Sequence, residues 1–404
     1  MLIRFLIAAF LASAASAQPS VFSQVDEMVR TLSEITGWQV KRTVPSEMLG
    51  QDKFRKMVES GVKKSESNKE IRAEEITLKM FGLVPQDFNL AKSEVDLVSE
   101  QAAAFYDYNK KRLFVLDSTQ PGAEQKVALV HELGHALADQ HHPLGKYLRK
   151  GNPDDDAATA REAVMEGQAT WLTWAYVSKT SGGKAEVPPK MLEEVTKAAS
   201  ETSPDFPVFS NSPLYLRESL VFPYNQGMRF QDAIFHKLGK EAFDRVFDRA
   251  PESTQQIMHP DDYIAGQKPS TPDPPRLESL LGKPAGKFRT LTDGPVGEFD
   301  TQILLRQYIS ENDGIAAAAH WKGGWFRLYE HKELKYPVLS YAADWDSSES
   351  AREYFRLYQR VLRGKWKKME ISEKTEDQVK GTGDSGRFIL RINGTLVSSV
   401  EGLR

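Results

Sequence analysis

The sequence contains no cysteine among its 404 residues. This absence excludes disulfide bonds, cysteine-ligated metal sites and lipid attachment through a cysteine thioether. An excess of positive charge is also missing, because the formal net charge is −3. Binding to a phosphate backbone needs a basic surface, so we expect no nucleic acid partner. Beyond the first residues, no apolar run is long enough for a transmembrane helix, and stable membrane insertion is not expected.

The first residues form the pattern of an export signal. Met1–Arg4 carries one positive charge, Phe5–Ala12 is apolar, and Ala15–Ala17 supplies the small residues that a signal peptidase prefers. We therefore predict a cleavable signal peptide at residues 1–17 and a periplasmic or secreted product. A short buried helix is the alternative reading of the same apolar run.

The remaining composition is that of an ordinary globular protein, with 40% apolar and 27% charged residues. A chain of this length exceeds what one hydrophobic core usually organises. We expect a large domain at residues 18–310 and a smaller one at 311–404.

Apolar periodicity predicts a mainly helical first half. Residues 21–80 fit helices up to a Gly-Pro break at 81–85, and residues 103–116 fit a β-hairpin. A helix is expected over 123–140 with one face in the core, followed by another over 157–177. The acidic run Asp154–Asp156 suits the cap of that second helix, with a calcium site as the alternative.

The second half changes character after residue 260. The proline-rich stretch 260–276 predicts an irregular connection. A small α+β module should follow, whose predicted elements are strands at 325–329 and 338–341, a helix at 347–362, and a closing hairpin of 388–392 with 395–400.

His131-Glu132-Leu133-Gly134-His135 is the motif that carries the most chemistry. Side chains four residues apart project from one face of a helix, so both imidazoles can bind one metal ion. Glu132 is then rotated toward the place of a bound water, as in zinc-dependent hydrolases with the HExxH pattern.

A catalytic zinc ion needs a third protein ligand. Glu166 and Glu162 are the candidates, because both lie on the next predicted helix and one turn apart. One carboxylate can bind the metal while the other orients a histidine. The apolar residues around them argue against two merely solvated charges.

Together these segments resemble the gluzincin group of zinc metallopeptidases, and secreted bacterial members in particular. The resemblance rests on VHELGHAL at 130–137, MEGQA at 165–169 and the hairpin at 105–115, and FPYNQG at 222–227 and the stretch 251–260 also resemble secreted bacterial proteins of this kind. It implies Zn²⁺ bound by His131, His135 and Glu166, and an α+β fold. In that fold a mainly helical, zincin-like catalytic domain with a small edge sheet precedes the C-terminal α+β module. An edge strand of such enzymes holds the substrate backbone by strand addition.

The activity implied is hydrolysis of peptide bonds in a peptide or protein substrate. Glu132 would act as general base toward a water polarised by zinc. Relatives stabilise the oxyanion with a tyrosine or histidine outside the motif, and Tyr224 and His259 are the candidates here. Tyr224 also fits a packed aromatic beside Pro223, and His259 a turn before Pro260.

Two other functions fit the same residues. The chain could be a non-catalytic zinc-binding scaffold that serves a partner, although Glu132 would then have no use. It could also be a zinc amidase acting on the cell wall, because the same water-activating residues serve other amides.

Overall fold

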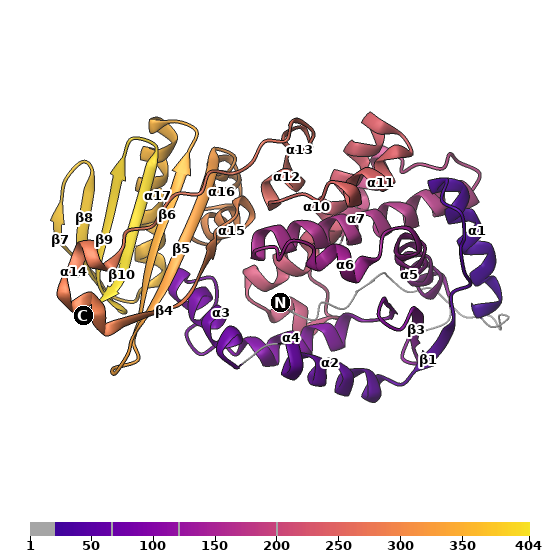
Figure 1. The fold of residues 1–404 in the computed structure, drawn as a ribbon, viewed down its shortest axis with the longest axis horizontal. Helices are drawn as coiled ribbons and strands as arrows, with labels where there is room; N and C mark the ends of the chain where they lie inside the picture. Colours follow the sequence, from indigo (N-terminus) through magenta and orange to yellow (C-terminus); the bar gives the residue numbers. More distant parts are fainter. Residues whose placement is uncertain (1–20, 66–67, 120–121, 199–200) are drawn as a thin grey trace.

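The computed structural model describes residues 21–65, 68–119, 122–198 and 201–404. The predicted signal peptide lies outside these residues. The fold is α+β, as predicted: a mainly helical N-terminal part holds a three-stranded sheet, and the C-terminal part is built on seven antiparallel strands. Figure 1 shows the two parts side by side, with α15 (Glu298–Tyr308) and α16 (Glu311–Ala318) between them. No described helix combines the length and apolar character that a bilayer crossing requires.

The first helices follow the predicted periodicity. α1 (Val25–Thr36) buries its apolar stripe and ends at Gly37, whose φ of 82° is left-handed. The predicted helical region also contains a strand that the prediction missed, β1 (Ser46–Leu49), which pairs in parallel with β3 (Arg112–Leu116). Two further helices complete this region, α2 (Gln51–Ser65) and α3 (Asn68–Phe81), and α4 (Leu90–Gln101) follows it after the predicted break.

The predicted hairpin is present as β2 (Ala104–Asp107) and β3 (Arg112–Leu116). The strand order β1-β3-β2 leaves β2 at an edge of the sheet, against α5 (Ala123–His141). The expectation that α5 buries only one face is wrong. Every residue from Ala128 to Gln140 is buried, because the sheet, α1 and α7 (Asp155–Thr180) surround the helix.

α7 (Asp155–Thr180) is the second predicted helix and packs against α5. Its cap is the predicted one, since the Asp154 carboxylate accepts a hydrogen bond from the Ala157 amide at 2.9 Å. Asp156 binds Thr254, and among the described residues the acidic run belongs to no metal-binding group. α10 (Leu214–Leu238) runs along α7 and completes the centre of this part.

Shorter helices enclose this centre. They are α6 (Leu144–Arg149), α8 (Pro189–Ala198), α9 (Pro207–Asn211), α11 (Glu241–Asp248) and α12 (Thr254–Met258). The irregular connection predicted from residue 260 is wrong at its start, where α13 (Pro260–Ala265) forms. Pro260 occupies the first turn of that helix, where its missing N–H removes no intrahelical bond. Residues 267–276 are neither helix nor strand.

The C-terminal sheet has the order β4-β5-β6-β10-β9-β8-β7. The predicted strands fall within β5 (Trp321–His331) and β6 (Pro337–Trp345), and β9 (Gly386–Asn393) and β10 (Leu396–Leu403) form the predicted closing hairpin. The predicted helix is α17 (Ser348–Lys365). Elements that the sequence did not reveal are α14 (Leu277–Leu281), β4 (Phe288–Pro295), β7 (Met369–Lys374) and β8 (Gln378–Gly383). β4 precedes residue 311, so the sheet includes a segment from the predicted large domain.

Candidate metal centre

The two histidines of the motif converge as their spacing predicts. On α5, the Nε2 atoms of His131 and His135 lie 3.1 Å apart. Both side chains are buried, at 4% and 1% exposure. Two imidazoles that share one helix face inside the core need a common polar partner.

Glu166 of α7 supplies that partner. Its Oε2 atom lies 3.2 Å from Nε2 of His131 and 3.4 Å from Nε2 of His135. The three residues form a buried group that could hold a metal ion. We call His131, His135 and Glu166 the metal group. Glu162, the alternative, lies one turn earlier on the wall of the adjoining cavity and is not part of the group.

The protonation states of the group suit a cation. Burial lowers the pKa of His131, which favours the neutral imidazole that binds metals. Burial alone would raise the pKa of Glu166, but the neighbouring histidines outweigh it and lower that pKa below its ordinary value. The carboxylate is therefore ionised beside at least one neutral imidazole.

Glu132 lies beside this group without joining it. Its side chain is fully buried, and its Oε2 atom accepts a hydrogen bond of 2.7 Å from the backbone amide of Tyr106 in β2. The Oε1 atom has no hydrogen-bond partner among the described residues. Burial, and then repulsion by Glu166, raise the pKa of Glu132 well above its usual value. A carboxylate in this setting is a strong proton acceptor.

Two glycines allow α10 to approach the metal group. A Cβ atom at Gly167, directly after Glu166, would overlap the backbone of Gly227, and one at Gly227 would overlap the Ala163 carbonyl. The two helices thus cross with backbone against backbone. The crossing brings Tyr224, one turn before Gly227, to stack on His131 with ring centroids 5.9 Å apart.

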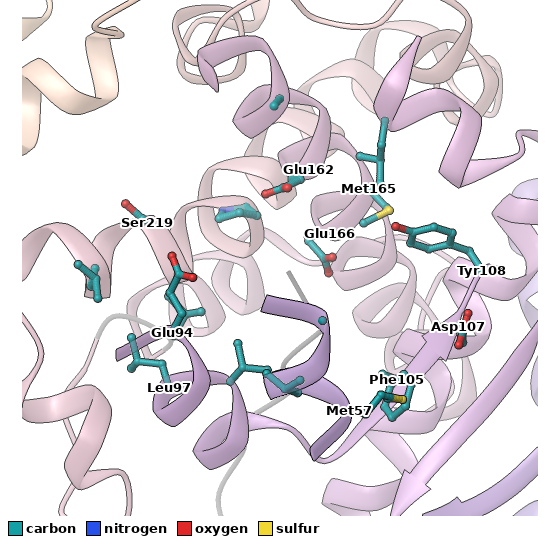
Figure 2. A pocket seen from close by; sticks show the side chains of 18 of the residues that line it. Met57, Glu94, Leu97, Phe105, Asp107, Tyr108, Glu162, Met165, Glu166 and Ser219 are labelled. Carbon is teal, nitrogen blue, oxygen red and sulfur yellow. The ribbon is translucent and has the colours of Figure 1, made fainter. Parts of the chain in front are cut away.

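A cavity of about 570 Å³ opens beside Glu166 and Tyr224. Figure 2 shows Glu94 and Leu97 of α4 on one side of it and Tyr108 on the other, with Glu166 between them. The walls come from α2, α4, β2, α7 and α10, and apolar side chains line much of them. The cavity can therefore hold a ligand that reaches the metal group.

His259 lies elsewhere. Its Nε2 atom binds the buried carboxylate of Glu298 at 2.8 Å, and the residue does not line the cavity. His141 and His142 lie at the C-terminal end of α5, and both are half-buried. His141 stacks on Trp38, and His142 binds Asp244 at 2.7 Å.

Two contacts of the site could not be foreseen. The Tyr106 amide reaches Glu132 from a strand, and the buried Asp139 carboxylate binds the Tyr106 hydroxyl at 3.0 Å. The only sequence signal was an aspartate one helical turn after His135, in a helix that proved to be buried on all sides.

Residues 288–404, which begin at β4, match a family described as "Domain of unknown function (DUF8575)". No curated protein and no solved structure matches the chain. The matched segment covers the C-terminal sheet and none of the metal group.

Proposed function

We propose that the protein is an exported zinc metallopeptidase of the gluzincin type, with a zincin-like catalytic part. The supporting observation is the buried convergence of His131, His135 and Glu166, with Glu132 beside them and a cavity alongside. The export signal expected at residues 1–17 supports action on peptides or proteins outside the cytoplasm.

The spacing of the three donor atoms supports zinc. Zn–N and Zn–O bonds of about 2.0–2.1 Å in a tetrahedral site imply ligand atoms about 3.3 Å apart. The separations here are 3.1, 3.2 and 3.4 Å. Two nitrogen ligands and one carboxylate oxygen also form a donor set that catalytic zinc sites use, and three protein ligands leave the fourth position open.

Zinc, when bound, would polarise a water molecule and the scissile carbonyl. Glu132 has the task of accepting the water proton and passing it to the leaving amine. Its Oε1 atom is free of competing hydrogen bonds among the described residues, while the Tyr106 amide fixes Oε2. Tyr224 is the nearer candidate for oxyanion stabilisation, because it stacks on His131, whereas His259 is paired with Glu298.

The cavity and the neighbouring strand supply a place for the substrate. β2 is an edge strand, and Phe105, Tyr106 and Asp107 line the cavity. An extended peptide that pairs with the groups of β2 other than the Tyr106 amide, which Glu132 occupies, would pass the metal group with one side chain directed into the apolar cavity. We therefore propose a peptide substrate bound in extended form.

The test is cleavage of a mixed peptide library by the purified mature protein, mapped by mass spectrometry with and without chelator. Glu132→Gln should keep stoichiometric zinc and lose hydrolysis by a factor of about 10²–10⁴, as expected for removal of a general base. His131→Ala should lose zinc after dialysis.

Three results would contradict the proposal. Chelator-insensitive cleavage would exclude a metal-dependent reaction, and full activity of Glu132→Gln would exclude the assigned base. A zinc-loaded wild-type protein that cleaves no peptide would favour a binding scaffold, or an amidase if it releases products from cell-wall fragments instead.

A further inference from the structure

Asp139 is the most heavily bonded carboxylate near the metal group. Its side chain is completely buried in α5. It accepts hydrogen bonds from the Tyr106 hydroxyl at 3.0 Å, from the Lys111 ammonium at 2.6 and 2.9 Å, from the Arg42 guanidinium at 3.2 Å and from the Leu144 amide at 3.0 Å. One carboxylate thus joins a hairpin, a loop and the start of α6 to the helix that carries the motif.

Two of these donors belong to the β2–β3 hairpin. Tyr106 lies in β2, and Lys111 stands in the turn with a φ of 56°. A non-glycine residue keeps such a left-handed conformation only where its surroundings hold it there. The bond from Lys111 to Asp139 is the contact that can hold it.

Tyr106 is attached to α5 at two points. Its backbone amide binds Glu132, and its hydroxyl binds Asp139. The two carboxylates are seven residues apart (139 − 132), which is about two helical turns and returns to the same face. The tyrosine therefore lies along α5 and fixes β2 in register with the motif.

This register determines the orientation of Glu132. A carboxylate that is held through Oε2 presents Oε1 in one direction, and Oε1 is the oxygen without a partner among the described residues. If β2 moved away from α5, the carboxylate could rotate, and the edge proposed to bind substrate would move with it.

We propose that Asp139 is a positioning residue that acts through Tyr106 and Lys111 to hold β2 against α5, and so fixes both Glu132 and the substrate-binding edge. This inference rests on the proposed peptidase function for its catalytic consequence. The positioning itself can be measured without any activity.

Asp139→Asn is a conservative probe of this role. The amide has nearly the shape of the carboxylate, so no cavity opens, and its oxygen can still accept one hydrogen bond. Lys111 and Arg42 are 40% and 45% exposed, so both cations can turn to solvent once the negative charge is gone. The hairpin then loses the ion pair between Lys111 and residue 139, while the packing of the core is unchanged.

Asp244→Asn is the matched control. The Asp244 carboxylate also holds the end of α5, since it accepts from the Trp38 indole at 2.8 Å and from His142 at 2.7 Å. Among the described contacts it has none with the hairpin. Loss of this carboxylate therefore tests whether loosening the end of α5 by itself is enough to move the hairpin.

The first measurement is hydrogen exchange of the zinc-loaded full chain, followed by mass spectrometry of peptides covering 104–116. Asp139→Asn should speed exchange of the Tyr106 amide at least tenfold, and Asp244→Asn should leave it unchanged. Unchanged exchange in Asp139→Asn, or an equal increase in both variants, would overturn the positioning role.

The second measurement is a double-mutant cycle with Tyr106→Phe, which removes the hydroxyl and keeps the amide. If Asp139 acts through Tyr106, the two changes are not additive, and the double variant exchanges no faster than Asp139→Asn alone. Additive effects would show that Asp139 acts by another route.

Hydrolysis by the same variants tests the catalytic consequence. With a peptide that the wild type cleaves, Asp139→Asn should lower kcat about tenfold or more at unchanged zinc content, and Asp244→Asn should not. An unchanged kcat would overturn the catalytic part of the inference. A wild type that hydrolyses nothing would instead refute the proposed function, while the exchange results would still decide the positioning.

Discussion

Burial and the contacts within the metal group favour the charge states that suit a bound cation. His131 is neutral because burial disfavours the imidazolium, and Glu166 is ionised because the histidines favour its charge. A neutral imidazole and an ionised carboxylate are the forms that bind a metal ion. Because each of the three side chains offers one ligand atom, loss of any one should weaken metal binding.

Tyr224→Phe tests the assignment of the oxyanion donor. The change removes the hydroxyl and keeps the ring that stacks on His131. We expect unchanged zinc content and a fall in kcat of about 10²–10³, the usual effect of losing one such donor.

Tyr215→Phe serves as the control for that experiment. Tyr215 also lines the cavity, but its hydroxyl binds Asp300 at 3.2 Å. Its loss should leave kcat within a few-fold of the wild type. Equal losses in both variants would assign the effect to the cavity wall rather than to oxyanion stabilisation.

Asp156 should make stability depend on pH. Burial raises the pKa of its carboxyl from 3.8 to about 8. Between these values the folded state holds a proton that the unfolded chain has lost, so the free energy of unfolding falls as the pH rises. Asp156→Asn resembles the protonated acid and can still pair with Thr254.

Urea unfolding at about pH 5 and about pH 8 checks this expectation. Relative to Asp156→Asn, the wild type should lose stability between the two pH values. Asp155→Asn, a change at the exposed neighbouring residue, should keep the wild-type pH dependence. A wild type and an Asp156→Asn variant with parallel pH profiles would exclude a buried, protonated Asp156.

The sequence predicted the part of the site that depends on one helix. Helical spacing alone places His131 beside His135, whereas the preference for Glu166 over Glu162 came from the family resemblance. Contacts between distant segments could not be predicted, because no spacing rule relates Tyr106 to Glu132 or His259 to Glu298. Those pairings depend on how α5 and α15 pack.

At the level of elements, the crossing of α7 and α10 determines the shape of the site. Gly167 and Gly227 bring the two backbones into contact, which no larger residue permits. This geometry is a physical reason for a glycine directly after Glu166. It keeps Tyr224 within stacking distance of His131.

Gly167→Ala should therefore destabilise the fold. Its Cβ atom would overlap the Gly227 backbone, and relief requires the helices to separate. We expect a loss of about 1–3 kcal/mol in the free energy of unfolding, the usual range for overpacking, together with weaker zinc binding.

Gly134→Ala, inside the motif, is the matched control. Its Cβ atom would lie 3.5 Å from the Cα atom of Ala169, an ordinary contact. Since alanine is also the better helix former, this variant should be as stable as the wild type or more stable by up to about 1 kcal/mol. Equal destabilisation of the two variants would refute the close crossing as the cause.

The strands that escaped prediction share weak patterns. β7 exposes five of its six residues, so its sequence shows no buried alternation, and β8 contains two glycines. β1 has four residues and pairs with a strand more than sixty positions later. Helices and hairpins were predictable because their patterns are local.

At the scale of the whole molecule, buried and partly buried contacts join the sheet to the helical part. The Lys365 ammonium, 2% exposed, binds Glu401 at 2.6 Å and the Met80 carbonyl at 2.8 Å. Phe299 of α15 packs on Phe222 of α10 with ring centroids 4.3 Å apart. The helix α15, which lies between the two parts, thus supports the helix that carries Tyr224.

Lys365→Met should test that junction. It leaves the Glu401 carboxylate buried without its cation, which typically costs about 3–5 kcal/mol. The double variant Lys365→Met/Glu401→Gln removes both charges and keeps an acceptor for the Tyr358 hydroxyl. It should recover part of the loss in chemical unfolding, and a double variant less stable than the single one would contradict this account.

The support of α10 by α15 has a consequence for the order in which the protein matures. The side chains of His131, His135 and Glu166 have all been synthesised once residue 166 is added, but the helix that supports the wall of the cavity ends only at Tyr308. A nascent or truncated polypeptide that stops between these points carries every ligand and lacks the α15 packing that supports α10. Under the proposed function, hydrolysis that depends on this support would begin only after most of the chain has been made.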